Sequence, residues 1–350
     1  MPVVTSGKVL VTGANGFVAA WVVKDLLDHG YSVRGTVRSE GKAPYLREFF
    51  KSHGDKFEVV IVEDITKEGA FDAAVSGVDA ILHIASPVTL AVVDPDEVIQ
   101  PAVRGTTSVL SAALRPENRA TIKRVVIMSS SAAVYVPPDP GHTNFTRVLD
   151  ERDWNTFSLK EVEEKGKDAN GLDKYRASKT LAERKAWEIY EAEKTKGLEW
   201  DLVTLQSPFI FGPIVHEAPS LDKFGGSPRI WYDNVVGGKA NEDTLTKLGF
   251  DFVDVRDLAR AHVLSLTVPE AAGQRFIIRA SEFVYQQFVD AARKFSDKVP
   301  VGYPSYNLAD ATFYARYSNE KSKKVLGLQY RSLEETTKDT IVDFESRGWL

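Results

Sequence analysis

The stretch VLVTGANGFVA at residues 9–19 decides the fold of this chain. Three apolar residues run directly into a turn that holds Gly13 and Gly16, and a helical pattern begins at once. Gly13 permits a tight turn, Gly16 lets the backbone approach a ligand, and Ala19 lets the helix pack close to the strand. The unpaired N–H groups and the positive end of the helix dipole favour an anion here. We therefore predict a pyrophosphate site, against the alternative of a glycine-bearing turn without a ligand.

Short β-branched runs alternate with longer helical patterns through the first half of the chain. Several runs are apolar without alternation, as expected of strands that are covered on both faces. Amphipathic stretches at 18–29 and 98–114 lie between them. This repetition predicts right-handed crossovers and an α/β fold, a Rossmann-type doubly wound parallel sheet. The expected strands are 9–11, 33–37, 59–62, 80–84, 125–128 and 202–205.

Composition and charge argue against several classes of function. The chain has 350 residues, a net charge of −5 and no basic stripe, so nucleic acid is not an expected partner. It has no cysteine, and its six histidines are scattered without ligand spacing, so we expect no metal. The first residues do not read as a signal peptide, and no stretch is apolar enough to span a membrane. A cytoplasmic protein is the expectation, and monomer and homodimer both stay open.

The end of the second expected strand indicates which dinucleotide binds. An enzyme that uses NAD usually places Asp or Glu there to hold the ribose hydroxyls, whereas this chain has Arg38, with Lys42 close behind. A guanidinium grips a 2′-phosphate through two hydrogen bonds, and Lys42 can add a second positive charge. We therefore predict NADPH (NADP+) as the cofactor. The alternative is that both side chains are solvated surface groups.

Two further strand ends are expected to contact the cofactor. The Asp64 carboxylate, followed by Ile65, can accept a hydrogen bond from the adenine amino group, although an aspartate that starts a turn is the alternative. The small residues Ala85 and Ser86 follow the fourth expected strand. They leave room for ribose and nicotinamide, because open α/β sheets bind ligands at the carboxyl ends of their strands.

The pattern changes after about residue 206, where prolines and glycines crowd a segment with little periodicity. Such a segment predicts long loops, which in compact proteins are usually functional. Later candidates are strands at 252–255 and 276–278 and helices at 255–266, 285–295 and 333–347. We expect residues 1–206 to form the NADP-binding unit, with 250–268 returning to it, and residues 207–249 and 269–350 to form a smaller, mostly C-terminal substrate-binding cap.

Tyr175 and Lys179 lie four residues apart at the start of a helical pattern, so they share a face. A phenol with a pKa of about 10 is a poor acid at neutral pH. A nearby ammonium favours the phenolate, so we expect Lys179 to lower the pKa of Tyr175 and to bond the nicotinamide ribose. An exposed pair is the alternative, since this spacing alone is a weak signal. Its combination with the glycine turn favours catalysis.

A serine run, Ser129-Ser130-Ser131, follows the strand expected at 125–128. A serine just past a strand end can bond a substrate carbonyl and orient it. The expected reaction is reduction of an aldehyde or ketone to an alcohol, in which hydride leaves nicotinamide C4 and Tyr175 delivers the proton. Negative charge grows on the carbonyl oxygen meanwhile, and the serine and the tyrosine stabilise it together.

Together these motifs resemble the extended short-chain dehydrogenase/reductase family over essentially the whole chain. They fall in family order: the glycine turn, the Arg38 strand end, Ala85-Ser86-Pro87, Ser129-Ser130, YRASK at 175–179 and FVDVRD at 252–257. Within the family the chain looks like the branch of methylglyoxal reductases, aldehyde (carbonyl) reductases and dihydroflavonol 4-reductases. GANGFVA at 13–19 and VDVRD at 253–257 resemble the aldehyde and methylglyoxal reductases in particular.

The resemblance implies that Ser130, Tyr175 and Lys179 form the catalytic set, because the family's serine is the second of its Ser-Ser pair. It also implies contacts from Arg38 and Lys42 to the 2′-phosphate, and an asparagine in a supporting role that these motifs do not locate. The residues expected to bind the cofactor are Thr12, Gly13, Asn15, Gly16, Phe17, Val18, Arg38, Lys42, Asp64, Ile65, Ala85, Ser86, Tyr175, Lys179, Ser207 and Pro208.

Some features depart from relatives. Family members often read Asn-Pro after the sixth strand, where this chain reads Gln206-Ser207-Pro208. Cinnamoyl-CoA reductases carry Asn-Trp-Tyr-Cys before the catalytic motif, where this chain has GLDKY at 171–175, so that branch is disfavoured. Sugar epimerases and dehydratases usually place threonine, often with an acidic pair, beside the serine site. Ser131-Ala132-Ala133 offers no such acids, so they are disfavoured too.

We expect an apolar substrate pocket built from residues 208–211 and the aromatic-rich stretch that follows, with ordinary cap core as the alternative for those aromatics. The alternative functions are a dihydroflavonol or steroid-type reductase with the same catalytic set, and a non-catalytic NADP(H)-sensing protein. An intact catalytic set argues against a sensor, which has no need of an acid. The expected pocket residues are Val88, Ser131, Phe209, Phe224 and Trp231.

Overall fold

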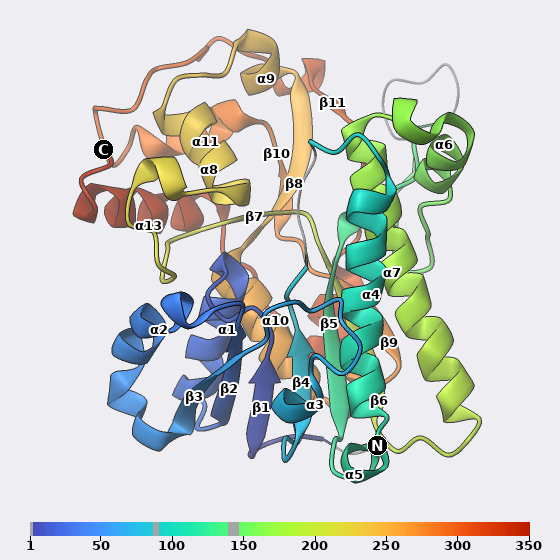
Figure 1. Ribbon diagram of the computed structural model, residues 1–350. Helices are drawn as coiled ribbons and strands as arrows, with labels where there is room; N and C mark the ends of the chain where they lie inside the picture. Colours follow the sequence, from blue (N-terminus) through green and yellow to red (C-terminus); the bar gives the residue numbers. More distant parts are fainter. Residues whose placement is uncertain (1–2, 87–90, 139–146) are drawn as a thin grey trace.

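The computed structural model describes residues 3–86, 91–138 and 147–350. Within these residues, a seven-stranded parallel sheet forms the centre of the N-terminal part of the molecule (Figure 1). The strand order is β3-β2-β1-β4-β5-β6-β9. The order reverses between β1 and β4, and such a reversal opens a crevice at the carboxyl ends of the strands. The predicted doubly wound sheet is confirmed. Its strands are β1 (Lys8–Val11), β2 (Ser32–Val37), β3 (Phe57–Ile61), β4 (Ala80–His83), β5 (Arg124–Ser130), β6 (Asp201–Ser207) and β9 (Gln274–Ile277).

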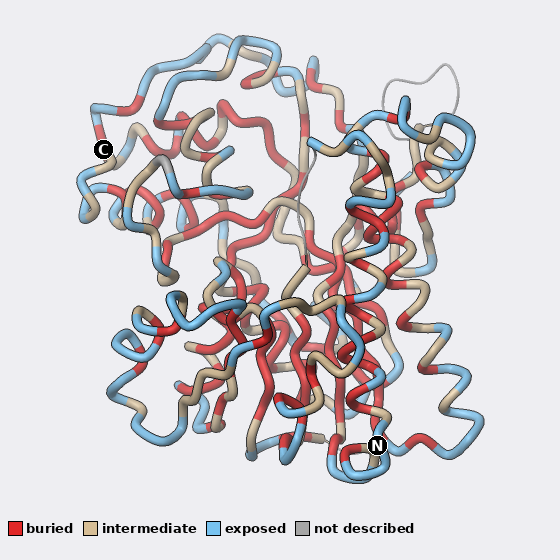
Figure 2. The backbone as a smooth tube through the Cα atoms, viewed as in Figure 1, coloured by how far each residue is buried: buried red, intermediate tan, exposed pale blue. Residues whose placement is uncertain are grey.

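Both faces of this sheet are covered, which explains the unbroken apolar runs. Val9 and Val11 pack with α1 (Phe17–Asp28) and α10 (Val255–Thr267), whereas Leu10 joins the cluster on the opposite face. Successive side chains of a strand point to opposite faces, so both sets must be apolar. Figure 2 shows the result as a band of buried residues through the sheet. The opposite face is covered by α3 (Asp72–Val75), α4 (Asp96–Ala113) and α7 (Gly171–Lys194).

The remaining helices are shorter or belong to the C-terminal part of the chain. Among the described residues, none of the helices is both long and apolar enough to cross a membrane. The remaining helices are α2 (Ala43–Phe49), α5 (Pro116–Arg119), α6 (Phe157–Lys165), α8 (Gly226–Trp231), α9 (Glu242–Thr246), α11 (Tyr285–Ala292), α12 (Glu320–Leu326) and α13 (Leu333–Ser346).

A smaller sheet above the strand ends forms the second layer of the molecule (Figure 1). Strand β8 (Leu248–Asp254) pairs in parallel with β7 (Phe209–Phe211) and β11 (Thr312–Phe313), and antiparallel with β10 (Ser281–Phe283). An aromatic core joins this sheet to α8, α11 and α13. It includes Phe211, Trp231, Phe252, Phe288 and Phe344.

Two aromatic residues expected in the substrate pocket lie in this core instead. Phe224 is 4% exposed and Trp231 is 1% exposed. Both rings pack edge to face against Phe344 of α13. The alternative prediction of ordinary cap core therefore describes them, because two large apolar rings next to a neighbouring helix lose more water there than beside a cleft.

The tail of the chain also returns to the large sheet at a place that the sequence did not indicate. Strand β9 pairs with β6, although residues 269–350 were expected in the cap. Residues 250–268 were expected to return to the sheet, but β8 lies in the smaller sheet and α10 packs beside α1. Strand β9 covers the edge of β6, which would otherwise leave its backbone groups unpaired. The division into a cofactor-binding unit and a cap stays a prediction.

Candidate functional site

The turn between β1 and α1 has the geometry of an anion site. Gly13 adopts a φ of +68°, and a Cβ added there would lie 3.1 Å from the Cβ of Ala85. Gly16 is the N-cap of α1, so no side chain caps the helix, and the first turn contains no acidic residue. The N–H groups of that turn are therefore left for a ligand, with the positive end of the helix dipole behind them.

Thr12 lies under this turn and ties two strands together. It is fully buried, and its Oγ1 accepts hydrogen bonds from the backbone N–H groups of Ile84 and Ala85, both over 2.9 Å. The Thr12 hydroxyl therefore donates its own proton to His83 Nδ1, at 3.0 Å. Burial, with the nearby Lys179 charge, lowers the pKa of His83 to about 3, so the ring is neutral and carries its proton on Nε2. Thr12 shapes the cleft from below rather than lining it.

A cleft of about 670 Å³ runs from this turn across the ends of the strands. It brings together fifteen of the residues predicted from sequence, from the glycine turn to Ser207 and Pro208. These residues are Gly13, Asn15, Gly16, Phe17, Val18, Arg38, Asp64, Ile65, Ala85, Ser86, Ser130, Tyr175, Lys179, Ser207 and Pro208.

The residues expected at the 2′-phosphate do not all lie in the cleft. Arg38 is exposed at the end of β2 and lines the cleft. Glu40, two residues further along the chain, is held by Arg47. Lys42 is not among the residues that line the cleft, and its Nζ lies 3.9 Å from Oε2 of Glu217. Arg38 thus lies where a cofactor could reach it, and the contacts of Arg38 and Lys42 with a 2′-phosphate stay predictions.

Asp64 lines the cleft and also starts a turn. Its Oδ1 accepts hydrogen bonds from the backbone N of Thr66 over 2.9 Å and from Thr66 Oγ1 over 2.7 Å. These bonds lower the pKa of the Asp64 carboxyl. Asp64 is therefore an aspartate that starts a turn, which was the alternative to a cofactor contact. Its hydrogen bond to adenine stays a prediction.

Ser130, Tyr175 and Lys179 meet at the same end of the cleft. Ser130 ends β5, and Tyr175 and Lys179 lie one turn apart in α7. Lys179 donates from Nζ to Ser86 Oγ over 2.8 Å, and that nitrogen lies 5.7 Å from the centroid of the Tyr175 ring. Burial lowers the pKa of Lys179 to about 8.

The influence of Lys179 on the Tyr175 phenol differs from the expectation. Burial raises the pKa of Tyr175, and the opposing effect comes from a hydrogen bond with Ser130. In this structure Ser130, not the ammonium, favours the phenolate. The reason is geometric, because the lysine nitrogen is directed to Ser86.

The other two serines of the run have different hydrogen-bond partners. Ser129 donates to Oε2 of Glu183 over 2.5 Å, which fits the alternation of side chains along β5. The Ser131 side chain is half-buried, and its backbone oxygen lies 3.4 Å from the Tyr317 hydroxyl. The choice of Ser130 made from the resemblance therefore agrees with its hydrogen bond to Tyr175.

Glu183 anchors the helix that carries Tyr175 and Lys179. It is 1% exposed, and its Oε1 accepts hydrogen bonds from Thr204 Oγ1 over 2.9 Å and from Arg275 Nε over 2.8 Å. Gln206 Nε2 adds a third at 2.6 Å. A buried carboxylate is tolerated only when it is paired in this way. The sequence interpretation missed this network, because its partners lie on strands far apart in the chain.

A second cavity of about 550 Å³ opens beside the cleft. It shares Ser130, Tyr175, Pro208 and Ser227 with the cleft, so both cavities meet at the reactive side chains. Of the expected pocket residues, Ser131 and Phe209 line it, whereas Phe224 and Trp231 do not and Val88 lies outside the described residues. Its aromatic and aliphatic walls are formed by Tyr135, Leu172, Phe209, Phe250, Tyr314 and Tyr317.

The N-terminal end of α8 contributes residues to the cleft that sequence reasoning did not assign to it. Gly225, Gly226, Ser227 and Pro228 line the cleft from the side of the smaller sheet. Adjacent glycines followed by a proline were a visible signal, but they predicted only a loop. The sequence could not place these residues in the cleft, because their position depends on how the smaller sheet and its helices pack over the large sheet.

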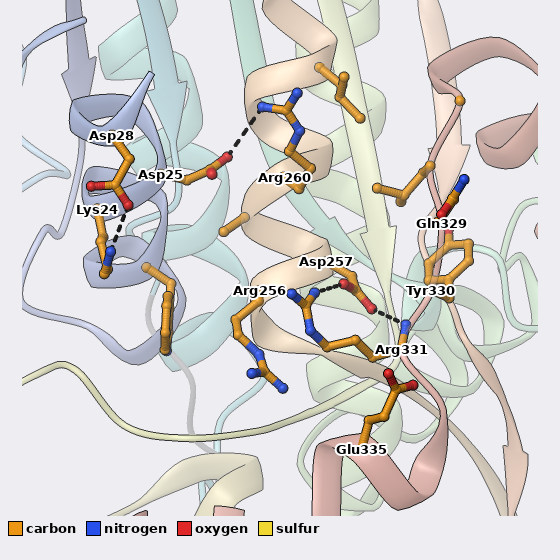
Figure 3. Close-up of a pocket in the computed structure, with 15 residues that line it drawn as sticks. Lys24, Asp25, Asp28, Arg256, Asp257, Arg260, Gln329, Tyr330, Arg331 and Glu335 are labelled. Atoms are coloured by element: carbon orange, nitrogen blue, oxygen red, sulfur yellow. Dashed lines mark hydrogen bonds and ion pairs between the residues drawn. The ribbon is translucent and has the colours of Figure 1, made fainter. Parts of the chain in front are cut away.

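A third cavity, of about 610 Å³, lies between α1, α10 and residues 327–335 (Figure 3), and Tyr175 does not line it. Charged side chains line it, and six of them form three ion pairs with one another. Its four basic and four acidic side chains leave no net charge, so it does not resemble a phosphate site. The pairs are Lys24 with Asp28, Asp25 with Arg260, and Asp257 with Arg331.

In the part of the chain that the structure describes, no group of three or more His, Asp or Glu side chains is placed to hold a metal ion.

Comparison with known proteins identifies relatives along almost the entire chain. A model of the NAD dependent epimerase/dehydratase family matches residues 9–278. The ketoreductase azaE of Aspergillus niger is 35% identical over 345 residues, which cover 95% of this chain and 96% of that protein. The crystal structure of yeast methylglyoxal/isovaleraldehyde reductase Gre2 complexed with NADPH superposes with a TM-score of 0.83 at 30% identity, covering 98% of this chain and 100% of that one.

The relatives also include a cinnamoyl-CoA reductase, a member of the branch that the sequence motifs disfavoured. Cinnamoyl-CoA reductase 1 of Arabidopsis thaliana is 34% identical over 354 residues, 99% of this chain and 91% of that protein. The differences before the catalytic motif therefore do not separate this chain from that branch by overall similarity.

Proposed function

The chain belongs to the NAD dependent epimerase/dehydratase family, the extended short-chain dehydrogenase/reductases, and we propose that it is an NADPH-dependent reductase of aldehydes or ketones. The observation that carries the proposal is that Ser130, Tyr175 and Lys179 line the same cleft as the glycine turn. A proton donor and an anion site for the cofactor then lie at the carboxyl ends of one sheet.

The residues of the cleft fit a phosphorylated dinucleotide. Gly13 and Gly16 leave space for a pyrophosphate at the N–H groups of the first turn of α1, and Arg38 supplies positive charge at the strand end where NAD enzymes carry an acid. NADPH, when bound, supplies the hydride. A relative that is 30% identical was solved with NADPH, which supports the choice of cofactor.

Tyr175, Ser130 and Lys179 each have a separate role in the proposed reaction. Tyr175 holds a proton, since burial raises its pKa, and delivers it to the carbonyl oxygen as charge develops there. Ser130, bonded to Tyr175, polarises the same oxygen. Lys179 brings a buried positive charge to the ribose side of the cleft, one helical turn from the phenol.

The proposal is tested by NADPH consumption at 340 nm across aldehydes, α-keto esters, diketones and flavanonols. We expect Tyr175→Phe to lower turnover by about 10²-fold to 10⁴-fold, the usual range for a general acid. NADPH binding, followed by the fluorescence of the bound nicotinamide, stays close to that of the wild type.

The matched control is Tyr190→Phe, in the same helix. The Tyr190 hydroxyl lies 3.3 Å from Asp201 Oδ1 and does not line the cleft. Its loss leaves turnover unchanged. Full activity of Tyr175→Phe would refute the acid role, and NADPH binding without turnover of any carbonyl would support a sensor.

A dihydroflavonol or steroid-type reductase is the second candidate. The cavity beside Tyr175, with its aromatic walls and volume of about 550 Å³, is of the size that accepts a bulky ring system. Faster reduction of flavanonols than of short aldehydes in the same panel would favour it.

A further inference from the structure

We propose that the cavity beside Tyr175 accepts oxo acids and that Arg176 binds the carboxylate of the substrate. This inference rests on the proposed carbonyl reduction and adds the class of substrate to it. Arg176 follows Tyr175 directly in α7, and both side chains line the cavity. A molecule in this cavity whose carbonyl oxygen reaches Tyr175 therefore shares the cavity with a guanidinium.

Arg176 is held in place without losing its capacity to bind an anion. Its Cζ lies 3.7 Å from the centroid of the Tyr135 ring, and its Nη1 lies 3.5 Å from Asp173 Oδ1. A guanidinium has five N–H donors, and a bond of 3.5 Å is at the limit of a hydrogen bond. The ring therefore acts as a flat support that orients the guanidinium at little cost in side-chain freedom.

The acid nearest to Arg176 is a weak competitor for a ligand. Asp173 accepts hydrogen bonds from Ser158 Oγ over 2.7 Å and from Asn170 Nδ2 over 2.6 Å. Both of its oxygens are thus engaged by neutral donors at shorter distances than the contact with Arg176. The long contact with Asp173 and the hydrogen bond with Tyr135 leave further N–H donors of the Arg176 guanidinium for a bound molecule.

Asp251 is the acidic side chain in the lining of this cavity, and its charge is compensated. It is 4% exposed, and its Oδ1 lies 2.6 Å from Nε of Arg279. Burial raises the pKa of the Asp251 carboxyl to about 7, so this group carries only part of its charge at neutral pH. The lining therefore favours an anion over a cation, and Arg176 is the group that meets it.

The residues that line the cavity indicate what the rest of the substrate is like. Tyr135, Phe209, Phe250 and Tyr314 line it, and such faces suit an aromatic or aliphatic body. Tyr175 and Arg176 both line this cavity of about 550 Å³, so one small molecule can present its carbonyl to Tyr175 and its carboxylate to Arg176. The fitting class is a 2-oxo or 3-oxo acid with an apolar tail.

The test compares an acid with its neutral counterpart, 2-oxo-4-phenylbutanoate and its methyl ester. We expect Arg176→Leu to lower the acid-to-ester ratio of kcat/KM by about 10-fold to 100-fold, the effect of one charge-assisted hydrogen-bonded contact. Arg176→Lys, which keeps the charge but loses the planar fork, gives a smaller fall. The control Arg184→Leu, in the same helix beside Trp154, leaves the ratio unchanged.

A binding measurement separates failure of this inference from failure of the proposed function. Calorimetry with 4-phenylbutanoate, which has no carbonyl to reduce, is run on the complex with NADP+. Weaker binding to Arg176→Leu than to wild type supports the carboxylate site whatever the enzyme turns over. An unchanged ratio, or equal binding to both proteins, overturns the inference, while reduction of the ester that needs Tyr175 leaves the proposed function standing.

Discussion

Arg275 donates from Nε to Oε1 of Glu183 over 2.8 Å, and this bond joins the edge strand β9 to the helix that carries Tyr175 and Lys179. The guanidinium also lies 3.6 Å from the centroid of the Trp154 ring and donates from Nη1 to the backbone oxygen of Asp153 over 2.9 Å. The position of the reactive helix thus depends on a residue about 100 positions further along the chain.

This relationship predicts a large cost for Glu183→Gln. Removal of one charge from a buried pair leaves the other uncompensated, and the usual loss is about 3–5 kcal/mol of unfolding free energy. Urea unfolding at pH 7 measures it. Glu188→Gln is the matched control, since the Glu188 side chain is 68% exposed and its pairing with Lys185 is a surface contact. Equal small losses in both variants would contradict the anchoring role.

Arg38→Asp is expected to move cofactor preference toward NADH. The substitution removes the positive group at the end of β2 and supplies a carboxylate that can accept from the ribose hydroxyls. The NADPH-to-NADH ratio of kcat/KM should fall by about 10-fold or more, because a charge-assisted contact is lost and a repulsion is added. Arg47→Asp, with the same charge change outside the cleft lining, should leave the ratio nearly constant. A ratio that does not move would show that Arg38 is a solvated surface group.

The pH dependence of reduction should reflect Lys179. Burial lowers its pKa to about 8, so the ammonium is present below that pH and is lost as the pH rises through it. If reduction needs this charge, kcat/KM is constant near neutral pH and declines above about pH 8, by about tenfold per pH unit. Rates measured from pH 6 to 10 test this. In Lys179→Arg, whose guanidinium stays protonated, the decline should vanish from the remaining activity. A wild-type profile that stays flat to pH 9.5 would argue against the assignment.

Protonation of His262 should lower the free energy of unfolding of the protein in acid. It is fully buried in α10, its Nδ1 lies 2.8 Å from the backbone oxygen of Leu258, and burial lowers its pKa to about 4. An unfolded histidine titrates near about 6.5. Its contribution to stability is therefore complete above that pH and is lost as the pH falls toward 4.

His262→Gln removes this titration and isolates it from all others. The difference in unfolding free energy between wild type and variant should shrink by about 1.4 kcal/mol per pH unit below pH 6.5. Urea unfolding of both proteins at pH 7, 6 and 5 measures the trend. A difference that stays constant over this range would mean that the folded protein binds the proton as readily as the unfolded chain.

Much of the site could be predicted because its motifs are local. Gly13 and Gly16 shape one turn that leaves the first N–H groups of α1 for a ligand, and Tyr175 and Lys179 share a face through helical spacing alone. The carboxyl ends of parallel strands then bring such motifs to one edge, so residues from Arg38 to Pro208 line one cleft. Lys42 does not line that cleft, because its position depends on a turn whose path the residue pattern does not specify.

By itself the sequence determined the alternating α/β sheet, the glycine turn and the pairing of Tyr175 with Lys179, because each follows from spacing within a few residues. Only the tertiary structure decided that β9 is an edge strand of the large sheet, that Trp231 lies in the aromatic core, and that Arg176 lines the cavity beside Tyr175. Those outcomes depend on which distant segments exclude water from one another, and no local pattern records that choice.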